Sequence, residues 1–309
     1  MKQVFVLGSI NMDLVIHVGR IPERGETLHG EAFFTNGGGK GANQAVACAK
    51  QGVECYLVGA VGEDVFADGL LETLKAYQVR IPFVRKLPTS TGVAMILIEE
   101  GDNRIVLDGG ANLCITKAQI DEALTHAKPG DYFVAQLENN VDAVHYGLAA
   151  AKAKGMITIF NPAPAARQPE EVYAFVDILV LNETECALLT GITPSDEAAM
   201  EQAYQKAAKW GIGCFILTLG ARGSVCFTPE GRLPVAPNPV AAVDTTAAGD
   251  TFVGVLAAQL AQERMLPDAL AYASVASSLT CCKRGAQCAI PTAEEIQSYL
   301  QSQAADTKA

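Results

Sequence analysis

The sequence lacks long apolar stretches. No apolar run approaches the roughly 18 residues that a membrane-spanning helix needs. The start Met1-Lys2-Gln3 leads directly into a short apolar segment, without the pattern of a signal peptide. We therefore expect no membrane partner and a cytoplasmic location.

Basic residues are also scarce. The chain has 23 Lys and Arg against 34 Asp and Glu, which gives a formal net charge of −11. Because there is no basic stripe that could release counterions, nucleic acid is disfavoured as a partner. An anionic substrate remains compatible with this charge, but backbone amides, a metal ion and a few local cations would have to hold it.

Motifs for zinc and for dinucleotides are missing too. The nine cysteines show neither C-x-x-C pairs nor a histidine spacing suited to zinc, so we expect buried reduced thiols. A redox role stays open for the vicinal pair Cys281-Cys282. No G-x-G-x-x-G follows the first apolar segment, which disfavours a Rossmann-type oxidoreductase.

Length and hydrophobicity predict a large α/β core. The 309 residues are 50% hydrophobic and 18% charged, which suits one large domain or one domain with a small appendage, and we predict a single domain over residues 1–309. Continuous apolar runs alternate with helical patterns, as in a doubly wound, mostly parallel sheet flanked by helices. The strands predicted for this sheet are 4–10, 56–61, 132–137, 157–160, 178–181 and 215–219.

Two other stretches follow β rather than helical periodicity. Residues from about 12–36 and 90–108 alternate apolar and polar positions and contain turn residues, as around Leu14, Ile16 and Val18. They predict a small separate β-sheet that forms a lid; the alternative is that both are extra edge strands of the main sheet. Because an uncovered apolar sheet face is costly, we expect the lid to pair with its copy in a homodimer.

A glycine-rich stretch from Asn36 to Asn43 leads into a helix predicted at 44–51. Its glycines let the backbone approach a ligand closely, while Lys40 and Asn43 supply donors at a helix N-terminus. The stretch is not a P-loop, because Gly41 follows Lys40 where that motif needs Ser or Thr. We predict a ligand-binding turn; the alternative is a purely structural glycine-rich turn, which would not need the lysine and the asparagine.

A second helix start, V-D-T-T-A-A-G-D-T-F-V-G at residues 243–254, has the features of an anion site. Backbone amides of the first turn, expected near Gly249, have no intrahelical partner and lie at the positive end of the helix dipole. An anion hole alone needs no carboxylate, so Asp250 suggests proton transfer from a neutral group that attacks a phosphate. The alternative is that Asp250 is only a first-turn residue favoured by the dipole.

Polar residues follow several predicted strands at what should be one edge of the sheet. Singly, each has an ordinary explanation: Asn182 is a plausible helix cap and Glu185 a plausible first-turn acid. Together they predict one continuous crevice, formed by Asn11, Asp13, Glu138, Asn161, Asn182, Glu185, Thr218, Gly220 and Asp250.

These motifs resemble the ribokinase-like family of ATP-dependent sugar kinases over nearly the whole chain. The matching segments are G-S-I-N-M-D at 8–13, G-G-K-G-A-N-Q-A at 38–45, N-P-A-P at 161–164, N-E-T-E at 182–185, T-L-G-A-R-G at 218–223, D-T-T-A-A-G-D-T-F at 244–252 and K-R-G-A-Q at 283–287. The G-G-K-G-A-N and A-A-G-D segments, in this order, are the specific ones.

The resemblance implies a role for each matching residue. It makes Asp250 the base that takes the proton of a primary hydroxyl. The amides implied to neutralise the transferring phosphoryl group are those of Ala247, Ala248 and Gly249. The residues implied to bind the sugar are Asn11, Asp13, Gly39, Lys40, Asn43, Glu138 and Asp250. The residues implied to bind the nucleotide are Asn182, Glu185, Thr218, Gly220 and Gly223, with Glu185 also holding Mg²⁺ through water. A monovalent-cation loop is implied at Asp244, Thr246, Lys283 and Gly285.

Two departures from the family pattern stand out. Ala247 occupies a position where many relatives have glycine, although its amide donates equally well. Lys283-Arg284 and Ala289 differ from the expected Arg-Lys and Ser of the cation loop, which bears on K⁺ dependence.

The resemblance implies an enzyme that uses ATP and Mg²⁺, with K⁺ as an activator, and phosphorylates a small sugar. D-ribose, giving ribose 5-phosphate, is the favoured acceptor. The alternatives are 2-deoxyribose, fructose or a nucleoside on the same scaffold, and a non-catalytic sugar-binding regulatory paralogue.

Overall fold

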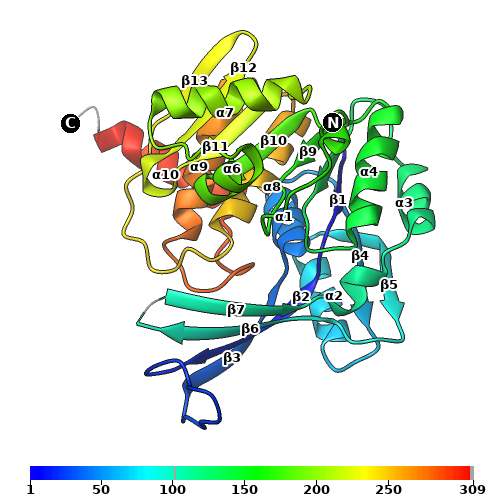
Figure 1. Ribbon diagram of the computed structural model, residues 1–309, viewed down its shortest axis with the longest axis vertical. Helices are drawn as coiled ribbons and strands as arrows, with labels where there is room; N and C mark the ends of the chain where they lie inside the picture. The colour runs from blue at the N-terminus through cyan, green and yellow to red at the C-terminus, as the bar shows by residue number, and fades with distance from the viewer. Residues whose placement is uncertain (101, 307–309) are drawn as a thin grey trace.

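The computed structural model describes residues 1–100 and 102–306. Its centre is a nine-stranded sheet in the order β13-β12-β11-β10-β9-β8-β1-β4-β5 (Figure 1). The strands are β1 (Val4–Leu7), β4 (Cys55–Gly62), β5 (Arg80–Leu87), β8 (Tyr132–Ala135), β9 (Ile157–Phe160), β10 (Ile178–Asn182), β11 (Cys214–Thr218), β12 (Ser224–Thr228) and β13 (Gly231–Val235). In this order, all neighbouring strands from β11 through β10, β9, β8, β1 and β4 to β5 pair in parallel, whereas β12 pairs antiparallel with both β11 and β13.

Helices cover both faces of this sheet. Because side chains alternate along a strand, Val4 and Val6 enter one hydrophobic core while Phe5 and Leu7 enter the other. The helices of the first core are α1 (Lys40–Ala49), α2 (Ala67–Ala76), α8 (Ala248–Ala261), α9 (Leu266–Thr280) and α10 (Ala293–Asp306). The helices of the second are α3 (Lys117–Leu124), α4 (Val141–Ala153), α5 (Glu170–Tyr173), α6 (Glu183–Thr190) and α7 (Glu197–Lys209). The predicted doubly wound, mostly parallel sheet is confirmed.

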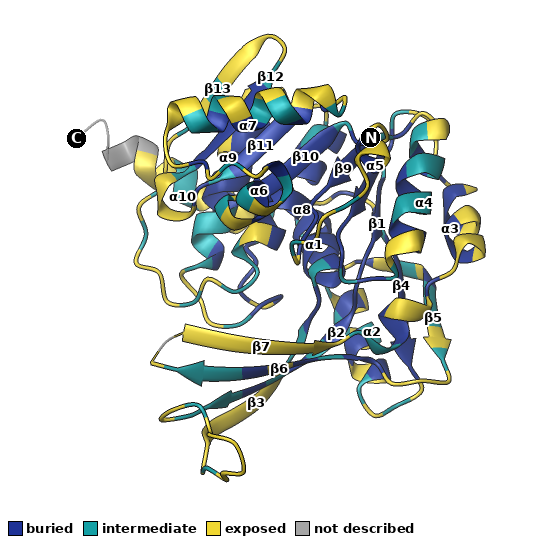
Figure 2. Cartoon of the chain, in the orientation of Figure 1, coloured by how far each residue is buried: buried dark blue, intermediate teal, exposed yellow. Residues whose placement is uncertain are grey.

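A separate four-stranded sheet in the order β3-β2-β6-β7 stands at one end of the molecule (Figure 1). Its strands are β2 (Asn11–His17), β3 (Glu31–Gly38), β6 (Gly92–Glu99) and β7 (Asp102–Asp108). Strands β2 and β6 pair in parallel, and the outer pairs are antiparallel. Figure 2 shows β7 exposed along its length, in contrast to the buried central strands of the large sheet. The predicted small sheet is therefore present and is not an edge of the large one.

The structure differs from the sequence-based prediction in several local details. Strand β1 ends at Leu7, so Asn11 and Asp13 are not in a loop after it but are the first residues of β2. Helix α1 begins at Lys40 rather than residue 44, because Gly37 and Gly38 belong to β3 and Gly39 alone makes the turn. Edge strand β5 was not predicted, since its arginines, lysine and proline mask the apolar pattern.

Within the described chain, no helix combines the length and apolar character required to cross a bilayer.

Candidate active site

The first part of the site lies where the strand order of the large sheet changes direction, between β1 and β8. Glu138, just beyond β8, connects the segments that follow these two strands. Its Oε2 accepts hydrogen bonds from Ser9 Oγ (2.6 Å), the Lys40 amide (3.0 Å) and Asn11 Nδ2 (3.4 Å). In the described chain Oε1 has no hydrogen-bond partner, so it is free to accept from a ligand hydroxyl.

Asn11 is held by a residue that the sequence analysis did not identify. Asn112, in the 3-10 helix η1 (Gly110–Cys114), donates from Nδ2 to Asn11 Oδ1 at 2.8 Å and accepts from the Ile10 amide at 2.9 Å. Gly92 packs against this pair, since a Cβ there would lie 2.3 Å from both amide side chains. Because Asn112 is 101 residues from Asn11 in the sequence, no local pattern indicates it.

Asp13 is a buried carboxyl group among other acids. Burial, reinforced by the charges of Glu138 and Asp250, raises the pKa of Asp13 to about 7. The side chain packs on Gly38, where a Cβ would approach Oδ2 to 2.2 Å. A carboxyl group that titrates near neutral pH can both donate to and accept from a hydroxyl group.

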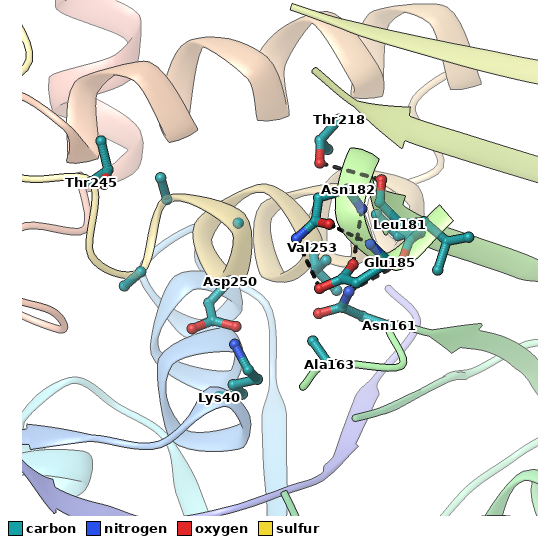
Figure 3. A pocket seen from close by; sticks show the side chains of 14 residues that line it. Lys40, Asn161, Ala163, Leu181, Asn182, Glu185, Thr218, Thr245, Asp250 and Val253 are labelled. Carbon is teal, nitrogen blue, oxygen red and sulfur yellow. Dashed lines mark hydrogen bonds between the residues drawn. The ribbon is translucent and has the colours of Figure 1, made fainter. Parts of the chain in front are cut away.

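Helix α1 begins after a turn that requires glycine. Gly39 has a φ of 90°, and a Cβ at this position would lie 2.8 Å from a backbone carbonyl oxygen. In Figure 3 the Lys40 ammonium group points toward the carboxylate of Asp250. The charge of Asp250 raises the pKa of Lys40, burial opposes this rise, and Glu138 and Glu185 add to it. The ammonium group therefore balances part of the negative charge of the site.

Asp250 lies in the first turn of α8 and is buried. Oδ2 accepts from Asn43 Nδ2 at 3.0 Å, and Oδ1 accepts from Gln44 Nε2 at 3.1 Å. Helices α1 and α8 approach this closely because Gly254 has no side chain: a Cβ there would lie 2.2 Å from the Gln44 carbonyl oxygen. The helix crossing thus brings Asp250 together with Lys40 and Asn43, which were predicted to bind sugar.

A cavity of about 230 Å³ opens beside Asp250 (Figure 3). Of the predicted site residues, those that line it are Lys40, Asn182, Glu185, Thr218, Ala247, Ala248, Gly249 and Asp250. Asn161, predicted to belong to the crevice, lines the cavity as well. Other lining residues, for which no role was predicted, include Ala163, Thr245 and Val253. The cavity therefore joins the carboxyl ends of β9, β10 and β11 to the start of α8.

The amides at the start of α8 border this cavity. The helix begins at Ala248, and its N-cap Ala247 has a left-handed conformation with a φ of 61°. The Ala248 amide donates to the Thr245 carbonyl at 3.2 Å, whereas the Ala247 and Gly249 amides have no acceptor in the described chain. Two of the three predicted amides are thus unpaired at the positive end of a 14-residue helix, which favours an anion.

Asn182 and Glu185 form a capping box at the start of α6. Asn182 Oδ1 accepts from the Glu185 amide at 2.8 Å, and Glu185 Oε2 accepts from the Asn182 amide at 2.8 Å. Burial raises the pKa of Glu185, although the hydrogen bond from Asn182 and the charge of Lys40 oppose this and Asp250 adds to it. The helix-cap explanation is therefore correct for the geometry, and the same two side chains also line the cavity.

Only one of three further residues predicted for the nucleotide pocket, Thr218, lines the cavity; its Oγ1 donates to the Leu181 carbonyl at 3.3 Å. Gly220 begins the short 3-10 helix η2 (Gly220–Arg222) with a φ of 54°. Gly223 packs against the backbone of Val235, where a Cβ would lie 2.3 Å from the carbonyl oxygen. Gly220 and Gly223 therefore shape the turn after β11 and do not line this cavity.

Asp244 joins the two segments predicted to form a monovalent-cation loop. Its Oδ1 accepts from the Thr246 amide and its Oδ2 from the Gly285 amide, both at 2.9 Å. Burial raises the pKa of Asp244, but hydrogen bonds from the side chain of Thr246 and from the Gly285 and Thr246 amides, with the charge of Arg284, outweigh it and hold the pKa below its usual value. The Lys283 side chain forms an exposed ion pair with Glu295 at 2.5 Å. Among the described residues, no group of three or more His, Cys, Asp and Glu side chains could hold a metal ion.

Known proteins resemble this chain in both sequence and fold. The model of the pfkB family of carbohydrate kinases matches residues 1–293. The ribokinase of Staphylococcus aureus (strain COL) is 39% identical over 299 residues, covering 96% of this chain and 98% of that protein. The bifunctional ribokinase/ribose-5-phosphate isomerase A of Fructilactobacillus sanfranciscensis is 40% identical over 304 residues, 97% of this chain, and the chain spans 56% of its length.

Among solved structures, Arabidopsis thaliana ribokinase complexed with ribose and ATP matches with a TM-score of 0.88 at 30% identity, covering 96% of this chain and 98% of that one. The predicted relationship to the ribokinase-like sugar kinases is confirmed. Its sequence match and its fold both place this chain in the pfkB family of carbohydrate kinases.

Proposed function

We propose that the chain transfers the γ-phosphoryl group of ATP to the primary hydroxyl of D-ribose, giving ribose 5-phosphate. The observation that carries the proposal is the position of a buried carboxylate, Asp250, beside unpaired amides of Ala247 and Gly249 at the same helix start. A base for a hydroxyl proton and donors for phosphoryl oxygens are thus adjacent. The names of the relatives, and the ribose and ATP of the Arabidopsis structure, support ribose as the acceptor.

The transfer requires one bond to form and one to break. The hydroxyl oxygen of the sugar attacks the γ-phosphorus, and the bridging oxygen leaves with its electron pair on ADP. Asp250 takes the hydroxyl proton. The unpaired amides and the Lys40 ammonium group stabilise the negative charge on the transferring group.

The residues that we propose for sugar binding surround this point. Glu138 Oε1 and the Asp13 carboxyl accept from sugar hydroxyls, and Asn11 and Asn43 add amide groups held in fixed orientations. We assign Gly39 to the same site, because its positive φ makes the turn that starts α1 beside Ser9 and Asn11. Polar side chains from β2, α1 and the segment after β8 together suit a polyol.

The nucleotide lies, in this proposal, along the cavity toward β10 and β11, between Thr218 and the start of α8, with Gly220 and Gly223 shaping the turn beside it. The residues fit Mg²⁺, because each Glu185 oxygen accepts one hydrogen bond from Asn182 and keeps a lone pair for a water of the ion's shell. Bound with ATP, Mg²⁺ neutralises charge on the phosphate oxygens.

One experiment separates the proposed ribose kinase from the two alternatives, a kinase for another sugar or a nucleoside and a non-catalytic sugar-binding paralogue. ADP release is measured with D-ribose, 2-deoxyribose, fructose and nucleosides, in the wild type and in Asp250→Asn. We expect the highest kcat/KM with D-ribose, and a loss of turnover of roughly 10²- to 10⁴-fold in Asp250→Asn with sugar binding retained in calorimetry. Near-normal turnover of Asp250→Asn refutes the assigned base, and sugar binding without ADP release identifies a non-catalytic paralogue.

We further propose that K⁺ activates the enzyme. Asp244 ties residues 244–246 to Gly285 through two backbone amides. The carbonyl oxygens of Thr246, Lys283 and Gly285 accept no hydrogen bond within the described chain, so they are available for a cation. An ion bound to Thr246 would stabilise the start of α8, because Thr246 directly precedes the N-cap residue Ala247.

The small sheet is proposed to act as a lid over the sugar and as the dimer interface. Strand β2 carries Asn11 and Asp13, and β3 leads directly into Gly39, so a movement of this sheet changes the sugar site. Closure would exclude water as a competing phosphoryl acceptor. The sheet also exposes large apolar side chains that a second copy could cover: Phe33, Phe34, Met95, Ile105, Val106 and Leu107.

Residues 1–309 are proposed to form a single domain, of which residues 101 and 307–309 lie outside the described part. The nine cysteines are free thiols, including the half-buried Cys281 and the exposed Cys282. Free thiols suit a reducing compartment, and we propose that the enzyme works in the cytoplasm.

A further inference from the structure

We propose that Gln44 is a positioning residue that holds the Asp250 carboxylate in the orientation for proton transfer. This inference rests on the function proposed for Asp250. Gln44 is fully buried on α1, and its Nε2 donates to Asp250 Oδ1 at 3.1 Å. The other carboxylate oxygen of Asp250, Oδ2, accepts a hydrogen bond from Asn43, whose side chain we assign to sugar binding. Gln44 therefore holds the base without contributing to sugar binding.

The orientation of the Gln44 amide is set by its other hydrogen bonds. Its Oε1 accepts from Gln136 Nε2 at 2.6 Å, and its Nε2 also donates to Asn161 Oδ1 at 3.3 Å. Asn161 is oriented in turn, because its Nδ2 donates to the Val180 carbonyl at 3.0 Å. A reversed Gln44 amide would place its oxygen against two acceptors, Asp250 Oδ1 and Asn161 Oδ1. The chain of amides thus permits a single direction.

The backbone of Gln44 is fixed as well. Gly254 packs directly on the Gln44 carbonyl oxygen, one turn after Asp250 on the same helix. Gln136 follows β8 and Asn161 follows β9, so segments after two strands of the large sheet hold the one side chain of α1 that contacts Asp250 Oδ1. Since a displacement of a reacting group by about 1 Å can lower a rate by about 10²-fold, this support affects turnover directly.

The test compares Gln44→Met with a matched control, Gln259→Met. Gln259 is a buried glutamine on α8 whose Nε2 donates to Gln262 and which lies outside the site. In Gln44→Met we expect kcat to fall roughly 10- to 100-fold with an unchanged KM for sugar, because the donor acts on the base and not on the substrate. In the control, kcat and KM stay at the wild-type values.

A double variant separates positioning from a general structural effect. In the Asp250→Asn background, adding Gln44→Met should not lower the residual rate further, since the residue acts only through the Asp250 carboxylate. An equal loss in both backgrounds, or an unchanged kcat in Gln44→Met, overturns the inference. If Gln44→Met does not fold, Gln136→Met serves instead, because it removes the donor that orients Gln44; a smaller fall in kcat at unchanged KM is expected, and no fall overturns the inference.

Failure of this inference is distinguishable from failure of the proposed function. If Asp250→Asn turns over normally, the base assignment is wrong. If Asp250→Asn is inactive while Gln44→Met keeps the wild-type kcat, only the positioning role is wrong.

Discussion

Replacing Asp13 by asparagine should stabilise the ligand-free protein at and above neutral pH. The Asp13 carboxyl is 8% exposed, lies near Glu138 and Asp250, and accepts no hydrogen bond within the described chain. Its ionised form is therefore poorly solvated and is repelled by its neighbours. Asparagine has nearly the same shape and carries no charge, so it removes both costs.

The magnitude follows from the pKa of Asp13, which rises from 3.8 to about 7 on folding. Between these values the folded state binds more protons than the unfolded state, so the free energy of unfolding falls as pH increases. The slope is about 1.4 kcal/mol per pH unit, and the whole window contributes about 4 kcal/mol. Below pH 4 the wild type and the variant should differ little, and above pH 7 the variant should be more stable by this amount.

Urea unfolding of both proteins between pH 4 and 8 measures this difference, because all other titrating groups are shared. Asp64→Asn is a control of opposite sign: burial raises the pKa of Asp64, but hydrogen bonds from Thr91 and Phe66 outweigh it and lower the pKa. That variant should lose stability above pH 4 and match the wild type only in acid. A stability difference for Asp13→Asn that does not change with pH, or that favours the wild type at pH 8, would refute the reasoning.

Other perturbations test the remaining parts of the site. Asp13→Asn should weaken ribose binding in calorimetry, which an unchanged Kd would contradict. Gly254→Ala should destabilise the protein by about 1–3 kcal/mol in urea unfolding and lower kcat, because the new Cβ separates α1 from α8. The control Gly69→Ala, in open space on α2, should stabilise the protein by up to about 1 kcal/mol in the same assay. Replacing Na⁺ by K⁺ should raise activity in the wild type and not in Asp244→Asn; equal responses would remove the cation loop. Val106→Lys should shift the protein toward monomer in analytical ultracentrifugation, and an unaltered mass would exclude β7 from the interface.

The α/β class of the fold could be predicted because its signals are local. Strands buried on both faces appear as continuous apolar runs, and the turns and helix starts between them use glycine and small residues. The prediction failed where local and tertiary preferences disagree. The apolar run from Val4 to Ile10 predicts one strand, but strand β1 ends at Leu7, and the chain then continues into β2 of the small sheet. Strand β5 lies at an edge and tolerates charged residues that conceal it.

What the sequence by itself determined is the inventory of the site and its local shape. Gly39 and the start of α8 around Asp250 are specified by adjacent residues, since a turn or helix start depends on a few neighbouring backbone groups. Only the tertiary structure decided which side chains touch Asp250 and Asn11, because Gln44 and Asn112 reach them across 206 and 101 residues of sequence. The same holds for the pKa of Asp13: desolvation and charge repulsion depend on distances in space, which no sequence pattern encodes.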